Sequence, residues 1–266
     1  MKISIAGCGN MGLVYARAFL KYNIVSENDL VLIEKNSDRR DELQKLKIGK
    51  VVTTEFPEIS KSDILIIAVK PQDFESLSAE IKNKPGKNTV VISIMAGIKI
   101  KTIRDKIDHP VVVRAMPNSP AELGMGMTGF SAANNLSVEQ IRKAENLLST
   151  TGRTIYFENE NLLDAVTALS GSGPAYFFYI VKSMIEAGKQ MGFDESTSAM
   201  LAKQTMLGSF HLLNTANKSL DELIKAVASK GGTTEAAFSV FEEKEIAENL
   251  RQGIIKARDR ARELSI

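Results

Sequence analysis

The chain has 266 residues, enough for one large domain or two smaller ones with a sizeable core. Apolar residues make up 44% and charged residues 25%, and the formal net charge of +2 gives no reason to expect a nucleic acid or a membrane as partner. A single cysteine excludes an internal disulfide framework, and the longest apolar run is far below the roughly 18 residues of a membrane span. The apolar run at the N-terminus breaks at Gly7, too early for a signal peptide, so we expect a cytoplasmic protein.

The first expected element is a short strand, Ile3–Ala6, which ends in a glycine turn and is followed by a helical pattern. In a dinucleotide-binding fold the first glycine of such a turn permits a tight bend, the second lets the backbone approach the pyrophosphate, and the third lets helix and strand pack closely. Free N–H groups at the helix N-terminus then face the anion. An ordinary glycine-rich turn is the alternative. The residues expected to contact the coenzyme here are Ala6, Gly7, Gly9, Asn10, Met11 and Gly12.

Strand-like and helix-like segments alternate over the first part of the chain, which indicates a parallel sheet covered on both faces. Further strands are expected at Leu30–Ile33, Ile64–Val69, Val90–Ile94, Val111–Val113, within Gly124–Ala132 and at Thr154–Phe157. Helices are expected between them at Asp38–Leu46, Asp73–Lys82, Ile100–Lys106 and Val138–Leu148. We therefore interpret residues 1–159 as an α/β Rossmann domain with a doubly wound, mainly parallel sheet.

The strand patterns end at about Asn159, and residues 160–266 are expected to form an all-helical domain. Helices are expected at Leu162–Leu169, from Pro174 to about Met191, from Glu195 to about Leu213, at Leu220–Ala228 and after Gly232. The expected capping residues are Asp194, Ser219 with Glu222, and Thr233 or Thr234. By analogy with small dehydrogenases, such a second domain carries substrate groups and the oligomer interface.

The end of the second strand bears on the choice of coenzyme, because an acidic residue there binds the ribose hydroxyls of NAD. Glu34 stands at this place, 22 positions after Gly12. The residues that follow it are Lys35, Asn36, Arg39 and Arg40. Cations there can bind the 2′-phosphate of NADP, or they can simply solvate a helix start. The two signals conflict; the sequence favours NADPH and leaves NADH open.

Two other strand ends are expected to contribute, because ligands in this architecture bind beyond the carboxyl ends of the strands. The isoleucine-rich strand ends in Ala68, Val69, Lys70 and Pro71. Its lysine can reach a ribose or phosphate oxygen, although an ordinary turn with a solvent-exposed lysine is the alternative. After the next strand, Met95 and Ala96 are expected near the nicotinamide end.

Conventional catalytic groups are scarce. His109 and His211 are the only histidines and neither lies in a motif, and the sequence has no Ser-His-Asp set, paired carboxylates or metal-ligand cluster, so no metal is expected. A better candidate is Ser229–Thr234, whose two glycines let the backbone present several N–H groups beside a helix N-terminus. Such a loop can hold a carboxylate; the alternative is a helix C-cap followed by an N-cap.

Five segments, in this order, closely resemble the pyrroline-5-carboxylate reductase family. They are Gly7–Gly12, Ala68–Pro71, Met116–Pro120, Ser170–Tyr176 and Ser229–Thr234, and the resemblance covers nearly the whole chain. The first segment is generic, whereas the later ones are specific in combination. The resemblance implies reduction of the cyclic imine Δ1-pyrroline-5-carboxylate to L-proline by NAD(P)H, the last step of proline synthesis. It also implies a homodimer through the helical domain, with dimers often assembled into a decamer.

The resemblance also implies roles around the substrate. The backbone groups that would hold the substrate carboxylate are those of Gly231, Gly232, Thr233 and Thr234. The Ser229 hydroxyl would join them, and the Thr234 hydroxyl would face the ring nitrogen. A positioned hydroxyl can stabilise that nitrogen while the loop fixes the ring against the nicotinamide. No general acid is evident, so the proton can come from solvent. Lys230 stands where the family usually has proline.

Two other functions are weighed against this one. A β-hydroxyacid dehydrogenase of similar architecture would carry a catalytic lysine about four residues after Gly173. Phe177 stands at that position, and the first lysine after the glycine turn is Lys182. A non-catalytic NAD(P)-sensing protein would not need the Ser229–Thr234 loop.

Overall fold

The computed structural model describes residues 1–53 and 58–265. The chain divides into two compact units, Met1–Ser172 with Ala257–Ile266 and, as the second unit, Gly173–Lys256. No helix among the described residues is long and apolar enough to cross a membrane.

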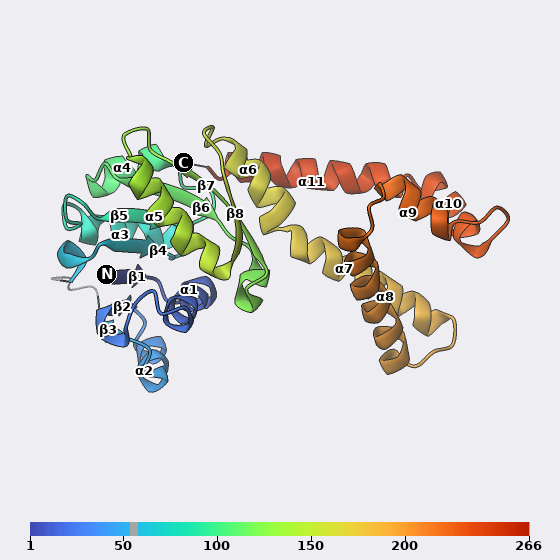
Figure 1. The fold of residues 1–266 in the computed structure, drawn as a ribbon, viewed down its shortest axis with the longest axis horizontal. Coiled ribbons are helices and arrows are strands. Elements are labelled where there is room, and N and C mark those ends of the chain that lie inside the picture. The colour runs from blue at the N-terminus through green and yellow to red at the C-terminus, as the bar shows by residue number, and fades with distance from the viewer. Residues whose placement is uncertain (54–57, 266) are drawn as a thin grey trace. The chain divides into compact units, whose positions relative to one another are not determined.

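Within the described residues, eight strands form one sheet in the first unit, in the order β3-β2-β1-β4-β5-β6-β7-β8 (Figure 1). All neighbouring strands are parallel except β6 and β7. The strands are β1 (Ile3–Ala6), β2 (Leu30–Ile33), β3 (Lys50–Val52), β4 (Ile64–Ile67), β5 (Val90–Ser93), β6 (Val112–Met116), β7 (Gly126–Ala132) and β8 (Gly152–Tyr156). The expected doubly wound, mainly parallel sheet is confirmed. Because β1 lies between β2 and β4, the carboxyl ends of these three strands surround the glycine turn.

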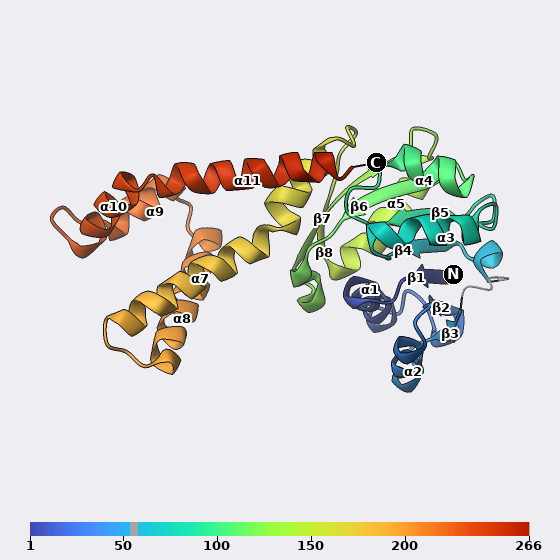
Figure 2. The same cartoon turned by 180° about the vertical axis from the view of Figure 1, so that it is seen from behind.

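Helices cover both faces of this sheet, as Figures 1 and 2 show from opposite sides. They are α1 (Asn10–Lys21), α2 (Ser37–Leu46), α3 (Phe74–Ile81), α4 (Ile100–Ile107), α5 (Val138–Leu148) and the short α6 (Leu162–Val166). Residues of α1, α2 and α5 pack on one face and residues of α3 and α4 on the other. Successive strand residues serve opposite faces: Ile64 and Ile66 belong to the first core, Leu65 and Ile67 to the second. Burial on both faces explains why these strands are continuously apolar.

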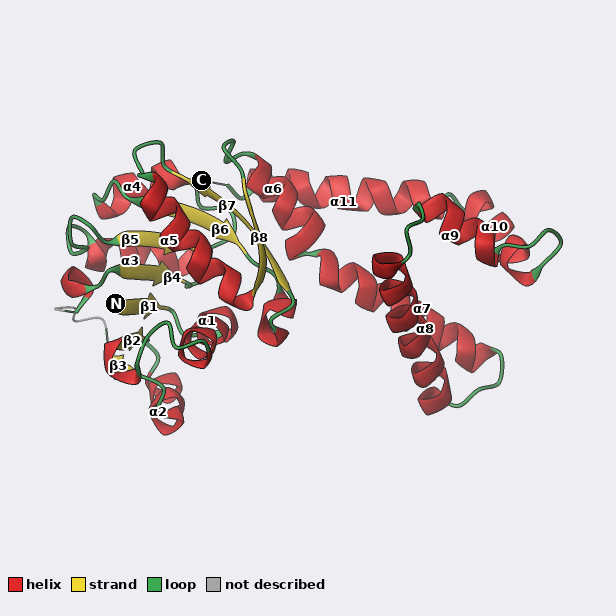
Figure 3. Ribbon diagram, in the orientation of Figure 1, coloured by secondary structure: helices red, strands yellow, loops and turns green. Residues whose placement is uncertain are grey.

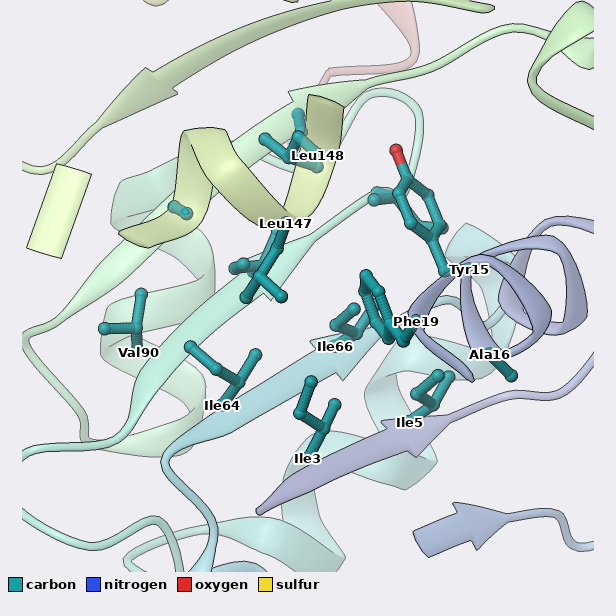
Figure 4. Packing of buried hydrophobic residues seen from close by; sticks show 14 of the residues in the cluster. Ile3, Ile5, Tyr15, Ala16, Phe19, Ile64, Ile66, Val90, Leu147 and Leu148 are labelled. Atoms are coloured by element: carbon teal, nitrogen blue, oxygen red, sulfur yellow. The ribbon is translucent and has the colours of Figure 1, made fainter. Parts of the chain in front are cut away.

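The core beneath α1 shows how the helix is held against the sheet (Figure 4). Tyr15 and Phe19, one helical turn apart, are fully buried, and their ring centroids lie 5.8 Å apart. They face Ile5 of β1 and Ile66 of β4. Burying one such aromatic side chain contributes about 1.5–3 kcal/mol, so α1 and the glycine turn before it are firmly placed.

A buried ion-pair network lies on β6, an internal strand of the sheet. Arg114 on β6 is 2% exposed; its Nη2 donates to Asp164 at 3.0 Å and its Nη1 to Glu160 at 3.2 Å. Asp164 also accepts from the Ser265 hydroxyl at 3.0 Å. The network therefore ties the segment around α6 and the C-terminal segment to the strand, and its hydrogen bonds offset the desolvation of the charges.

The second unit is helical, and Figure 3 shows only helices and loops there. It contains α7 (Gly173–Gln190), α8 (Glu195–Thr215), α9 (Leu220–Val227) and α10 (Thr233–Glu243), and α11 (Ile246–Glu263) begins in it. The expected cap at Asp194 and the capping box of Ser219 with Glu222 are confirmed. The expected cap by Thr233 or Thr234 is wrong: Gly232 is the N-cap of α10, and both threonines lie inside the first turn.

Large apolar side chains remain exposed on this second unit. Examples are Phe178 at 69%, Tyr179 at 72% and Met200 at 64% exposure. Its buried residues, by contrast, are small ones such as Gly188, Ser198 and Ala202. A unit with so little core and so much exposed apolar surface is typical of a chain that buries this surface against another copy.

Candidate functional site

The glycine turn between β1 and α1 has the geometry that a pyrophosphate requires. Gly7 has φ +90°, and a Cβ atom there would lie 2.7 Å from the backbone nitrogen of Val69. A Cβ on Gly12 would lie 2.2 Å from the carbonyl oxygen of Gly7. At Gly9, in contrast, no described atom lies within 4 Å of the Cβ position. Two glycines therefore permit close packing, and the middle one leaves open space above the turn.

The start of α1 offers hydrogen-bond donors toward that space. Gly9 is the N-cap and has no capping side chain, and the first intrahelical bond runs from Leu13 N to the Gly9 carbonyl at 3.0 Å. The N–H groups of the first turn are thus available to an anion. Donors beside open space fit the phosphates of a dinucleotide, so the fold and the turn agree on the class of ligand.

A pocket runs from the glycine turn along the ends of β2 and β4. Its lining residues are Ala6, Gly7, Gly9, Ile33, Glu34, Lys35, Ala68, Val69, Lys70, Asp73, Ser76, Leu77 and Glu80. The structure therefore brings eight of the expected coenzyme residues together. The expected residues outside this lining are Asn10, Met11, Gly12, Asn36, Pro71, Met95 and Ala96. The lining residues that were not expected are Ile33 at the end of β2, Asp73 just before α3, and Ser76, Leu77 and Glu80 on α3.

Glu34 points to the glycine turn. Its Oε2 accepts from the backbone N–H of Cys8 at 3.2 Å, and its Oε1 accepts from that of Asn36 at 3.1 Å. A carboxylate that is fixed by two backbone donors at the end of β2 stands where ribose hydroxyls bind in NAD-dependent folds.

The cations that follow Glu34 are engaged with the protein. Arg39 donates from Nε to the Cys8 carbonyl at 3.1 Å and pairs with Glu42 at 2.6 Å. Arg40 donates to the Lys35 carbonyl at 2.7 Å. These arginines stabilise the glycine turn and the start of α2. This agrees with the alternative that the cations belong to the helix start and do not bind a 2′-phosphate.

Cys8 and His109 are both buried in the protein interior. Burial, followed by the negative charge of Glu34, raises the pKa of the Cys8 thiol to about 12, so the reactive thiolate is suppressed. His109 is buried, and its Nε2 donates to the Thr89 carbonyl at 2.7 Å. Burial lowers the pKa of this imidazole, which is therefore neutral at pH 7. His211 lies on α8, and no group of at least three metal-binding side chains exists among the described residues.

The other strand ends are held by specific contacts. Met95 follows β5 and is 2% exposed, so its side chain is buried. Asn118, just after β6, donates from Nδ2 to the Ser170 hydroxyl at 3.1 Å and accepts from Met127 N at 2.9 Å. Two of the segments that carried the family resemblance, Met116–Pro120 and Ser170–Tyr176, thus meet in the first unit through this asparagine side chain.

The Ser229–Thr234 loop belongs to the second unit and forms a tight turn. Gly231 has φ +72°, and Gly232 N donates to the Ser229 carbonyl at 3.0 Å. A Cβ on Gly232 would lie 2.5 Å from Ser229 Oγ, so the serine hydroxyl lies over this glycine. The first intrahelical bond of α10 runs from Ala236 N to Gly232 O at 3.1 Å, which leaves the N–H groups of the first turn without intrahelical partners. The Glu235 carboxylate accepts from Gly231 N.

Comparison with known proteins covers the whole chain. Residues 160–264 match the family model described as pyrroline-5-carboxylate reductase dimerisation, and residues 2–97 match the one described as NADP oxidoreductase, coenzyme F420-dependent. The pyrroline-5-carboxylate reductase of Aquifex aeolicus is 32% identical over 99% of this chain and 97% of that protein. That of Methanosarcina acetivorans is 33% identical, with the same coverage of each. The solved structure of a pyrroline-5-carboxylate reductase from Coxiella burnetii has a TM-score of 0.85 and 29% identity, covering 100% of this chain and 98% of that one.

Proposed function

Because the chain belongs to the pyrroline-5-carboxylate reductase family, we propose that it reduces Δ1-pyrroline-5-carboxylate to L-proline, the final step of proline synthesis. A nicotinamide coenzyme supplies the hydride when bound. The observation that carries this proposal is the full-length similarity to these reductases, combined with a glycine turn whose open space and donors fit a dinucleotide. The activity is that of an oxidoreductase.

In the coenzyme site we assign the phosphates to the turn Gly7–Gly12 and the N–H groups of Asn10 and Met11. Glu34 orients the ribose through its fixed carboxylate. Residues Ala68 to Pro71 form the wall at the end of β4, and Lys70 lines the pocket there. Lys35 and Asn36 flank the ribose, whereas Met95 and Ala96 bound the nicotinamide end. The family match to an NADP oxidoreductase supports a nicotinamide coenzyme, and NADPH remains the preference expected from the sequence.

The substrate carboxylate is assigned to the Ser229–Thr234 loop. The N–H groups at the start of α10 have no capping side chain and the Ser229 hydroxyl lies over Gly232, and the helix N-terminus favours a negative charge there. The Thr234 hydroxyl is assigned to the ring nitrogen, where it stabilises the nitrogen as hydride reaches the adjacent carbon. Because Thr234 does not cap α10, its hydroxyl is not committed to the helix backbone. Lys230 is exposed and adds a positive charge next to the loop.

The oligomer is proposed to be a homodimer through the helical unit, with dimers assembled into a decamer. The exposed apolar side chains of α7 and α8 support the dimer, as does the match of residues 160–264 to a dimerisation model. Such surface is costly to leave in water and is covered when two copies associate. The proposed location is the cytoplasm.

A threonine-to-alanine variant tests the assignment of the substrate loop. Thr234→Ala is expected to lower kcat/KM by the equivalent of roughly 1–3 kcal/mol, the scale of one lost polar contact, without changing coenzyme affinity. Ser239→Ala, which removes a hydroxyl farther along α10, is the matched control and should retain parental activity. If Thr234→Ala keeps full kcat/KM, or loses coenzyme binding tenfold, the assigned role is wrong.

A further inference from the structure

We infer that Asp73 sets the coenzyme preference of this site, because it pairs with Lys35 and so biases the pocket toward NADH. The inference rests on the proposed function only in that it requires a nicotinamide dinucleotide to bind in the pocket. Asp73 lies 38 positions after Lys35 along the chain, and no sequence motif connects the two residues.

The fold brings these two residues together across the pocket. Lys35 follows β2, and Asp73 ends the short 3-10 turn Pro71–Asp73 after β4. Since β2 and β4 flank β1, their carboxyl ends stand on either side of the glycine turn. Lys35 Nζ reaches Asp73 Oδ1 at 3.1 Å, and both residues line the pocket together with Glu34. The ion pair therefore lies next to the carboxylate of Glu34, which is assigned to the ribose.

Arg39 and Arg40 stand near Lys35, but neither arginine lines the pocket. Arg39 is held by the Cys8 carbonyl and Glu42, and Arg40 by backbone carbonyls of the β2–α2 turn. Lys35 is therefore the cation on the pocket lining that could meet a 2′-phosphate beside Glu34, and it is already neutralised by Asp73.

The charges of the lining disfavour a further anion. Lys35 and Lys70 stand against the carboxylates of Glu34, Asp73 and Glu80. A 2′-phosphate would have to break the Lys35–Asp73 pair and then lie between two carboxylates. A 2′-hydroxyl, in contrast, can donate to Glu34 and leave the pair intact. The basic residues after Glu34, on which the expected preference for NADPH depends, are thus held by contacts within the protein.

The test measures coenzyme binding to the substrate-free protein by titration of NADH and NADPH fluorescence, so it does not depend on turnover. Asp73→Asn should lower the Kd of NADPH about five- to tenfold and leave the Kd of NADH within about twofold. This range is the effect expected from releasing one exposed ion pair and removing one repelling charge. The gain should shrink in high salt, because the groups are solvent-accessible. Adding Lys35→Met to Asp73→Asn should remove the gain.

Glu75→Gln is the matched control. It removes a neighbouring carboxylate that pairs with Lys106 and lies outside the pocket lining, so the ratio of the two Kd values should not change. An unchanged ratio in Asp73→Asn, or a parent protein that binds NADPH tenfold more tightly than NADH, overturns the inference. Failure of the folded parent to bind either coenzyme would instead overturn the proposed function.

Discussion

Alanine substitutions at Gly12 and Gly9 should have opposite consequences, although both place a methyl group in the same turn. At Gly12 the new Cβ would lie 2.2 Å from the carbonyl oxygen of Gly7, well inside contact distance, and both groups belong to the backbone. The turn and α1 would have to separate, which costs about 1–3 kcal/mol or more. At Gly9 the backbone has φ −68° and the Cβ position is open, so stability should fall by no more than about 1 kcal/mol, the difference between glycine and alanine as an N-cap.

Coenzyme binding should separate the two variants again. The Cβ of Gly9→Ala would enter the space assigned to the pyrophosphate, and we expect at least a tenfold loss of affinity, about 1.4 kcal/mol. Urea unfolding measures the first effect and coenzyme fluorescence titration the second. The reasoning is refuted if Gly12→Ala is as stable as the parent, or if Gly9→Ala folds normally and binds coenzyme as tightly as the parent.

Two further predictions concern buried charge. Arg114→Met leaves the buried Asp164 carboxylate without its ion-pair partner, and it should lower the free energy of unfolding by about 3–5 kcal/mol in urea titration; a loss below 1 kcal/mol would contradict the role given to the network. Because burial depresses the pKa of His109 in the folded state, the unfolded state binds the proton more readily, so stability should fall as the pH drops below the ordinary imidazole value of 6.5. His109→Gln should flatten this part of the stability profile, and an unchanged slope would show that another group is responsible.

Most of the fold could be predicted from the sequence, because the strands of a parallel sheet are apolar on both faces and stand out between helices. The exceptions have physical reasons. β3 (Lys50–Val52) is a three-residue edge strand that is only partly buried, so it leaves almost no apolar pattern. β6 was expected to end at Val113 but continues to Met116, since the buried charge of Arg114 is compensated by carboxylates some fifty residues later. The domain boundary at residue 159 remains a prediction; the compact units divide at Ser172.

The candidate site was predictable where one local motif contains it and not where the strand order creates it. The glycine turn and the end of β4 are continuous segments, and Gly7, Gly9 and residues 68–70 of them line the pocket, whereas Asn10, Met11, Gly12 and Pro71 do not. Asp73 and Glu80 join the same pocket only because β4 lies beside β1, a contact that no local pattern encodes. Thr233 and Thr234 were both misplaced as caps, because the left-handed Gly231 is followed by Gly232 as the N-cap and the helix already begins at Thr233.

The central claim is tested most directly by incubating the folded protein with Δ1-pyrroline-5-carboxylate and either NADH or NADPH, following the nicotinamide absorbance and quantifying proline. The account predicts that absorbance falls only when substrate is present, with one L-proline formed for each coenzyme oxidised. A folded sample that binds coenzyme but forms no proline with either one would contradict it.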